Sequence, residues 1–259
     1  MSFRISLQLY TVRDETRKDF WGTCARVAEI GYEWVELAGL PKGNLEEFVS
    51  HFEALGLGIS GAHVPYEKVA YETQKVCAEH LSLGCRDIII PSLPSSLVYS
   101  VENWGETAKR LNNLAEECAR VGIRLSFHNH DVEFLATFPT LRSDERGSGE
   151  FHTFWHQLMK SAPALLAQVD TYWVARAGYD VSDILEFVSG RVPSVHVKDM
   201  GADLEDVEFG RGVLDWSSIF NACVSAGVGT LVIELDRPKI SSLESARISL
   251  ENLRAFLQL

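Results

Sequence analysis

The sequence has few cysteines and no long apolar run. Five cysteines are spread over 259 residues without a Cys-x-x-Cys pair, which argues against a disulfide framework and favours reduced thiols in the cytoplasm. No apolar stretch approaches the roughly 18 residues of a membrane span. The first residues, MSFRISLQLYTVRDE, are interrupted by polar side chains and show no export signal. We expect a soluble cytoplasmic protein with no membrane partner.

Basic residues are also in short supply. The 24 Lys and Arg residues face 36 Asp and Glu residues, for a net charge of −12. A surface that binds phosphate backbones would oppose this field, so nucleic acid is a disfavoured partner. The composition, 46% hydrophobic and 23% charged, is typical of a globular protein. The length fits one domain over residues 1–259, and the sequence leaves a homo-oligomer open.

Short β-rich runs alternate with segments whose apolar residues recur at helical spacing, which is the βαβ signature. Glycines stand where the helices should end, at Gly31, Gly56, Gly84, Gly122, Gly190 and Gly227. Eight such units predict an α/β fold, a (β/α)8 TIM barrel, with a doubly wound open sheet as the alternative. The predicted strands are residues 5–12, 34–40, 58–65, 87–94, 123–130, 165–173, 193–200 and 230–236.

One segment departs from the short-loop pattern. Residues 131–150 carry charge, serine and glycine without clear periodicity. Two interpretations stay open: a mobile lid over the site, or a surface insertion without function. Shortening the segment separates them, because loss of a lid changes KM or kcat.

Polar residues end the last four predicted strands. Catalytic groups of a barrel project from the carboxyl ends of its strands, and residues two apart share one face of a strand. One imidazole or carboxylate per strand should therefore converge. A mixed nitrogen and oxygen set suits one divalent metal ion, such as Mn, Zn, Co or Mg, with positions left for substrate oxygens. The candidate ligands are His128, with His130 as its alternative, Asp170, His196 and Glu234.

Other polar residues should ring the same mouth. Each either binds substrate hydroxyls or satisfies loop backbone. The candidates for substrate binding are Gln8, Tyr10, Glu36 and His63, with Trp173, Arg176 and Arg237 supplying an apolar wall and cationic contacts. We interpret His51, His80, His152 and His156 as surface or packing residues.

Several segments, in collinear order over nearly the whole chain, resemble the sugar phosphate isomerase/epimerase family of xylose isomerase-like TIM barrels. They include ISLQLYTVRDE, AEIGYEWVELAGL, GAHVP, GIRLSFHNHDVEF, DTYWVARAG, VHVKDM and IELDRP. The resemblance implies a divalent metal and a small polyhydroxy carbonyl substrate. It also implies a ligand set of Glu, Asp, His and Glu, of which Asp170, His196 and Glu234 match. The first glutamate position falls on His128.

The departure at His128 bears on the expected reaction. Related ketose 3-epimerases are understood to use two metal-bound glutamates as opposed bases, and here only Glu234 remains. We expect a metal-dependent sugar isomerase or epimerase that works through an enediolate, with Glu234 as base.

The second proton-transfer group stays open. His130 or Glu133 is the candidate for a second base. His130 or Lys198 is the candidate acid, although Lys198 is alternatively an ion-pair partner of Asp199. The alternative functions are a metal-dependent dehydratase or lyase of a keto-inositol or keto-glycoside, and a non-catalytic sugar-binding barrel.

Overall fold

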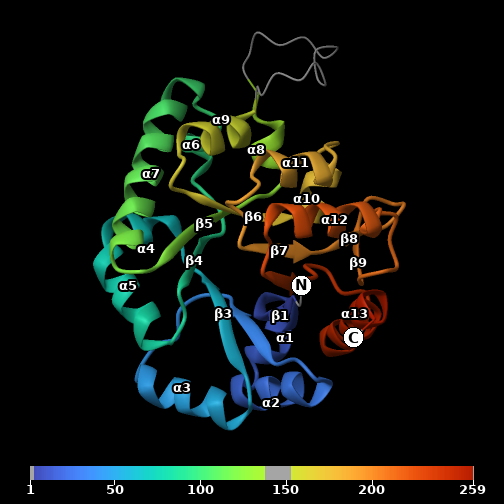
Figure 1. Cartoon of the computed structure of the whole chain (residues 1–259). Coiled ribbons are helices and arrows are strands. Elements are labelled where there is room, and N and C mark those ends of the chain that lie inside the picture. Colours follow the sequence, from blue (N-terminus) through green and yellow to red (C-terminus); the bar gives the residue numbers. More distant parts are fainter. Residues whose placement is uncertain (1–2, 138–152, 259) are drawn as a thin grey trace.

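Eight parallel strands close into a barrel, with helices around the outside (Figure 1). The computed structural model describes residues 3–137 and 153–258. The strand order around the barrel is β1-β10-β7-β6-β5-β4-β3-β2, which confirms the predicted barrel and excludes the open sheet. The strands are β1 (Arg4–Gln8), β2 (Trp34–Leu37), β3 (Gly58–His63), β4 (Asp87–Ile90), β5 (Arg124–His128), β6 (Leu166–Asp170), β7 (Ser194–Val197) and β10 (Thr230–Ile233).

All eight predicted strands exist, but each was predicted to run too far. The run over residues 5–12 is a strand only to Gln8 and then becomes the 3-10 helix η1 (Leu9–Val12). The run over residues 165–173 ends at Asp170, where α10 (Thr171–Arg176) begins. Apolar residues continue from each strand into the short helix, so hydrophobicity alone does not mark the strand end.

The larger helices that surround the barrel end close to the glycines that predicted their ends. The six glycines named above all take a positive φ shortly after a helix, from 66° at Gly84 to 110° at Gly31, as helix C-capping requires. The helices of the first half are α1 (Arg13–Thr16), α2 (Phe20–Ile30), α3 (Leu45–Ala54), α4 (Tyr66–Tyr71), α5 (Thr73–Ser82), α6 (Ser95–Val98) and α7 (Trp104–Arg120).

The second half adds a small β ribbon to the helices. After β7, β8 (Asp199–Met200) pairs antiparallel with β9 (Asp206–Val207). The helices are α8 (Val132–Leu135), α9 (Phe154–Ser161), α11 (Val181–Phe187), α12 (Trp216–Ala226) and α13 (Ser242–Leu257). The segment predicted as a lid or an insertion begins with α8, and residues 138–150 lie outside the described residues, as does His152.

The outward and inward faces of the strands differ in character. Outward residues such as Leu7, Val169 and Val195 are completely buried under the helices, as expected for a parallel sheet covered on both faces. Inward-facing side chains near the carboxyl ends of the strands are polar and buried. We call this part of the barrel interior the polar layer. All five cysteines are free and buried. Among the described residues, no helix combines the length and apolar character of a membrane span.

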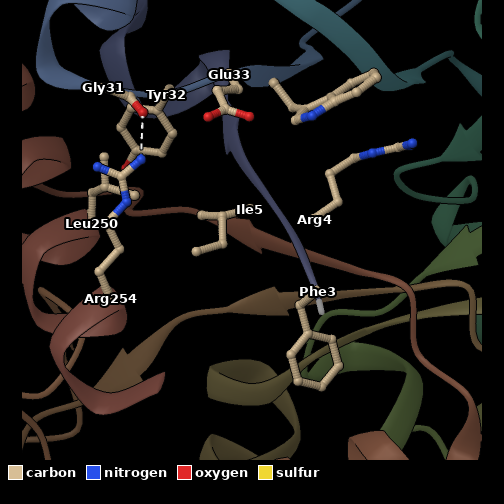
Figure 2. Close-up of a pocket in the computed structure, with 9 residues that line it drawn as sticks. Phe3, Arg4, Ile5, Gly31, Tyr32, Glu33, Leu250 and Arg254 are labelled. Carbon is tan, nitrogen blue, oxygen red and sulfur yellow. Dashed lines mark hydrogen bonds between the residues drawn. The ribbon is translucent and has the colours of Figure 1, made fainter. Parts of the chain in front are cut away.

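A hollow of about 460 Å³ lies at the amino ends of β1 and β2, beside α13 (Figure 2). Arg4, Glu33 and Arg254 line it. Arg254 donates to the carbonyl of Gly31 at 2.7 Å and thereby joins α13 to the end of α2. Since barrel enzymes place their chemistry at the carboxyl ends of the strands, this hollow lies at the opposite end from the predicted site.

Tyr32 supplies a second tie between α13 and the start of β2. Its hydroxyl donates to the carbonyl of Ala246 at 2.8 Å, and the side chain is 3% exposed. We predict that Tyr32→Phe lowers the free energy of unfolding by about 0.5–1.5 kcal/mol, because one buried hydrogen bond is lost. Urea unfolding measures the change. Tyr99→Phe, at a side chain that is 60% exposed, is the control. Equal midpoints for the two variants would contradict the prediction.

Candidate metal and catalytic site

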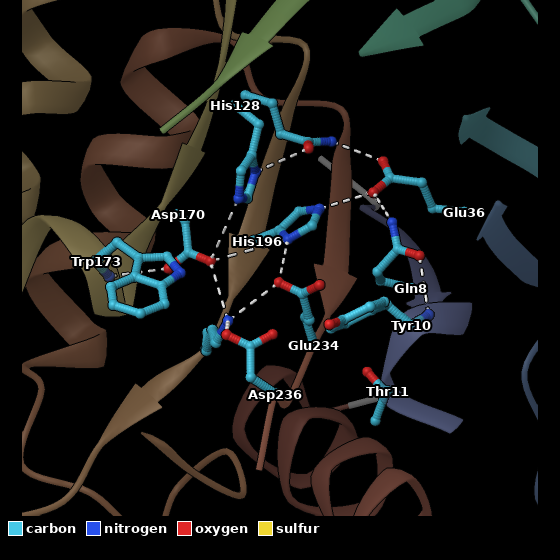
Figure 3. Close-up of polar contacts among 12 residues, drawn as sticks. Gln8, Tyr10, Thr11, Glu36, His128, Asp170, Trp173, His196, Glu234 and Asp236 are labelled. Atoms are coloured by element: carbon cyan, nitrogen blue, oxygen red, sulfur yellow. Dashed lines mark hydrogen bonds and ion pairs between the residues drawn. The ribbon is translucent and has the colours of Figure 1, made fainter. Parts of the chain in front are cut away.

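The four candidate ligands converge at the carboxyl ends of four neighbouring strands (Figure 3). Each offers one ligand atom, and these four atoms all lie within 4.8 Å of one another. Regular pairing causes the convergence, since the register sets Asp170 beside His196 across β6 and β7. The structure therefore brings together the buried set chosen from the sequence, His128, Asp170, His196 and Glu234.

Asp170 leaves one carboxylate oxygen for a ligand. Its Oδ1 accepts the N–H of Trp173 at 3.0 Å, which caps α10, and its own N–H donates to Asn129. Its Oδ2 is buried without a hydrogen-bond partner among the described residues. This atom lies 3.9 Å from His196 Nδ1 and 4.0 Å from His128 Nε2. A buried unpaired carboxylate oxygen facing two imidazole nitrogens is a donor set that fits a divalent cation.

His196 is fixed between two carboxylates. Its Nε2 lies 2.7 Å from Glu36 Oε1, and its Nδ1 lies 2.9 Å from Glu234 Oε2. Burial lowers the pKa of His196, but the attraction of Glu234 and Glu36 outweighs it and raises this pKa to about 10. The ring is therefore held by charge-assisted hydrogen bonds on both sides.

Glu36 holds the polar layer beneath the four ligands. It accepts from Gln8 Nε2 at 2.7 Å and Gln168 Nε2 at 2.6 Å, and His63 Nε2 lies 3.1 Å away. Burial raises the pKa of Glu36, but the neighbouring imidazoles lower it overall. Gln8 and Glu36 are 0% and 1% exposed. Their observed partners are side chains of the layer and, for Gln8 Oε1, the backbone N–H of Tyr10 at 3.0 Å. The direct substrate contact expected for them stays a prediction.

Gln168 is a site residue that the sequence analysis missed. Its Oε1 lies 3.2 Å from His128 Nδ1 and 3.0 Å from His63 Nε2, while its amide donates to Glu36. It therefore orients His128 with respect to the other ligands. The signal was present, because Gln168 stands two residues before Asp170 and shares its inward face of the strand.

Lys198 points into the site and is 1% exposed. Its Nζ lies 3.2 Å from Glu234 Oε2, 3.7 Å from Asp170 Oδ2 and 2.5 Å from Asp236 Oδ2. Burial lowers the pKa of Lys198, but these three carboxylates raise it overall, so the ammonium stays charged. Asp199 instead accepts backbone N–H groups of the loop that follows it. The ion-pair alternative therefore holds, with Asp236 and not Asp199 as partner.

A pocket of about 500 Å³ opens above the ligands. His63, His130, Glu234 and Arg237 are among its lining residues. The His130 ring lies 5.0 Å from that of His128. Burial, with the charge of Lys198, lowers the pKa of His130 to about 4. His130 is thus a neutral base facing the pocket.

The remaining candidates lie beside this pocket. Trp173 packs its ring 5.3 Å from the ring of His130. Arg176 joins the loops at the rim, since it donates to Asp131 at 3.3 Å and to the carbonyl of Leu204 at 2.9 Å. Arg237 lines the pocket from an exposed position. Substrate contact stays a prediction for all three.

Comparison with known proteins adds the family to this geometry. Residues 24–256 match the xylose isomerase-like TIM barrel family. No curated protein sequence matches the chain. Among solved structures, a sugar phosphate isomerase/epimerase from Parabacteroides distasonis is similar with a TM-score of 0.81 and 20% identity, over 98% of this chain and 95% of that one.

Two further structures share the fold at lower identity. The IolI protein with a bound zinc atom has a TM-score of 0.74 and 13% identity, over 99% of this chain and 98% of that one. The D-psicose 3-epimerase of Clostridium cellulolyticum H10, solved with D-tagatose, has a TM-score of 0.72 and 13% identity, over 98% and 99%. Because the family match spans most of a closed barrel, the chain belongs to the xylose isomerase-like TIM barrel family.

Proposed function

We propose that this protein is a divalent-metal-dependent isomerase or epimerase of a sugar or keto-sugar, possessing an enediolate-type mechanism. The observation that carries the proposal is the convergence of two imidazoles and two carboxylates within 4.8 Å at the strand ends, with Asp170 Oδ2 buried and without a hydrogen bond among the described residues. Support also comes from similar barrels that are named as sugar isomerases or epimerases, and from one named with bound zinc. We keep the cytoplasm as the proposed compartment.

His128, Asp170, His196 and Glu234 would hold one divalent ion such as Mn, Zn, Co or Mg. His196 would then give up the proton on Nδ1, which faces Asp170 and Glu234, and keep the Nε2 proton that Glu36 accepts. When bound, the ion supplies Lewis acidity that makes the C–H beside a carbonyl group easier to deprotonate. The buried position of the four ligands keeps bulk water away from the reacting carbon and strengthens electrostatic interactions there.

Glu234 is the base that the geometry favours. It lines the pocket, and its Oε2 accepts from His196 and Lys198. Burial raises the pKa of Glu234, but the charges of Lys198 and His196 lower it well below its usual value. The carboxylate is therefore ionised at neutral pH and ready to accept a proton. A positioned general base contributes about 10²–10⁴-fold to rate.

His130 and Lys198 take the remaining roles. His130 is neutral and faces the pocket, so it can accept or return a proton on another side of the substrate. Lys198 carries a permanent charge beside Glu234. Its ammonium stabilises negative charge that develops on a substrate oxygen.

Elimination of water is the second candidate function. Burial and the neighbouring imidazoles lower the pKa of His128 well below its usual value, so it is neutral. Glu234 is then the carboxylate of the ligand set that lines the pocket. Dehydration of a keto-inositol or keto-glycoside needs one base and one acid. Glu234 is the base, and the ammonium of Lys198 is the acid, since His130, with a pKa of about 4, is not protonated at neutral pH.

We predict that the wild-type protein retains about one equivalent of Mn²⁺ or Zn²⁺ after gel filtration. Asp170→Asn and His196→Ala should each weaken metal affinity by more than about 100-fold, since the loss of a ligand exceeds the loss of an outer partner. Elemental analysis measures the metal content. Asp183→Asn, on the exposed face of α11, is the control. Equal metal content in all four proteins would contradict this assignment.

We predict that Glu234→Gln lowers exchange of solvent deuterium into a panel of keto-sugars by about 10²–10⁴-fold, because the base is removed. The variant should remain folded but with a lower Tm, because His196 and Lys198 each lose a buried carboxylate partner. Chelator treatment of the wild type should abolish exchange, and added Mn²⁺ should restore it. Full activity of the stripped protein would refute metal dependence.

Two readouts of the same assay separate the alternative functions. Ultraviolet absorbance of an enone product would identify dehydration, and sugar binding without exchange would identify a binding barrel.

Glu133 lies beside His130 and accepts its backbone N–H at Oε2, at a distance of 2.8 Å. Glu133 is 1% exposed, and burial raises its pKa to about 7. The pKa of Glu133 is therefore higher in the folded than in the unfolded protein, and the free energy of unfolding decreases as pH rises from about 4.5 through 7.

We predict that Glu133→Gln removes this loss. Relative to the wild type, the variant should gain on the order of 2 kcal/mol of unfolding free energy between pH 5 and pH 8. Urea unfolding at both pH values measures it, with Glu102→Gln at an exposed position as control. A parallel pH profile for wild type and Glu133→Gln would disprove the buried neutral carboxyl group.

A further inference from the structure

A second hollow opens directly from the pocket above the ligands. This hollow, of about 570 Å³, lies between the segments that follow β1 and β2. We call it the side groove. The two hollows share the lining residues Tyr10, Arg13, Ala38 and Gly39. The two hollows therefore adjoin, with Tyr10, which is 43% exposed, between them.

The walls of the side groove are largely aromatic and apolar. Phe20, Trp21 and Phe48 line it, and all three are only partly buried. The ring centroids of Trp21 lie 5.0 Å from Phe20 and 5.1 Å from Phe48, so the rings support one another. Leu40 and Pro41 also line it. Rigid aromatic walls of this kind favour a flat apolar group over a bare polyol.

The charges in the side groove are all positive. Arg13, Arg17 and Lys42 line it, and within residues 3–137 and 153–258 no aspartate or glutamate does, although the chain carries a net charge of −12. Arg17 and Lys42 are exposed, and neither pairs with a carboxylate in the part of the chain that the structure describes. A local positive field in an acidic protein selects a ligand with negative charge.

Arg13 connects the side groove to the catalytic groups. Its guanidinium lies 4.1 Å from the Tyr10 ring and donates to the carbonyls of Tyr10 at 2.8 Å and Asp236 at 2.6 Å. Asp236 is the residue whose carboxylate pairs with Lys198. The wall between the two hollows is thus fixed to the site, and a ligand can occupy both at once.

We propose that the substrate is a conjugate whose polyhydroxy carbonyl part occupies the pocket while a flat, negatively charged apolar group, such as an aromatic carboxylate, occupies the side groove. This inference rests on the proposed function and specifies its substrate class. A free sugar leaves the aromatic walls unused, and a simple phosphate uses the cations but not the rings.

Calorimetric titration of the wild type compares three probes: 4-carboxyphenyl β-D-glucopyranoside, phenyl β-D-glucopyranoside and D-glucose. We expect the carboxylated probe to bind at least about tenfold more tightly than D-glucose and at least about threefold more tightly than the phenyl glucoside. Equal affinity for the three, or no measurable binding of the carboxylated probe, overturns the inference. D-glucose 6-phosphate is titrated as a fourth probe, and its binding as tightly as the carboxylated probe would overturn the aromatic part of the inference.

Charge reversal locates the binding. Lys42→Glu and Arg17→Glu should each weaken the carboxylated probe at least about threefold and leave the phenyl glucoside nearly unchanged. Lys109→Glu, at an exposed position on α7 outside the groove, makes the same change in net charge and is the control. Equal effects of Lys42→Glu and Lys109→Glu would show a general field and overturn the location.

The deuterium-exchange assay separates this inference from the proposed function. If deuterium exchanges into keto-sugars but Lys42→Glu and Arg17→Glu do not change probe binding, the side groove is rejected as a substrate site and the proposed reaction stands. Probe binding that depends on both residues, without exchange into any keto-sugar or keto-glycoside, rejects the proposed reaction and leaves the side groove as a ligand site.

Discussion

The site depends on one buried imidazole that is held from both sides. His196 lies between Glu36 on β2 and Glu234, which directly follows β10. β10 pairs directly with β7, and β2 is joined to β10 through β1. Closure of the barrel therefore brings Glu36 and Glu234 to His196 from two sides. Charged groups this deeply buried are tolerated only when each finds a partner. The buried charges therefore need the closed barrel to bring their partners within reach, and the closed barrel needs these pairings to hold charge in its interior.

The balance of charge in this layer explains its chemistry. Glu36, Glu234 and Asp236 each have a cationic or imidazole partner, whereas Asp170 Oδ2 has no hydrogen bond among the described residues. Burial raises the pKa of Asp170 to about 7, with Lys198 opposing and Glu234 adding to the rise. The centre of the layer is thus where an additional positive charge gains most, and it coincides with the meeting point of the four ligand atoms.

The sequence was sufficient to predict that these four side chains converge, because they obey strand alternation, whereas their binding of a metal stays a prediction. His128 and Asp170 end their strands and His196 is the second-last residue of β7, so position along the strand predicted which way they face. Alternation does not give depth, which is why Glu36 was expected at the mouth and lies in the layer beneath. The pairing of Lys198 with Asp236 depends on how two loops meet, and adjacency in the sequence suggested Asp199 instead. Apolar residues also continue beyond Gln8 and Asp170 into the helices that follow, so the hydrophobic pattern did not show where these two strands end.

His128 has the largest consequence for the reaction. A glutamate there would place a second ionised base opposite Glu234, whereas the buried neutral imidazole contributes a ligand nitrogen without a negative charge. In the proposed mechanism, proton removal and return by Glu234 alone would occur on one side of the substrate, which would give isomerisation or elimination. Inversion at carbon needs a group on the other side. His130, which lines the pocket and whose N–H is held by Glu133, is the residue whose position decides between these outcomes.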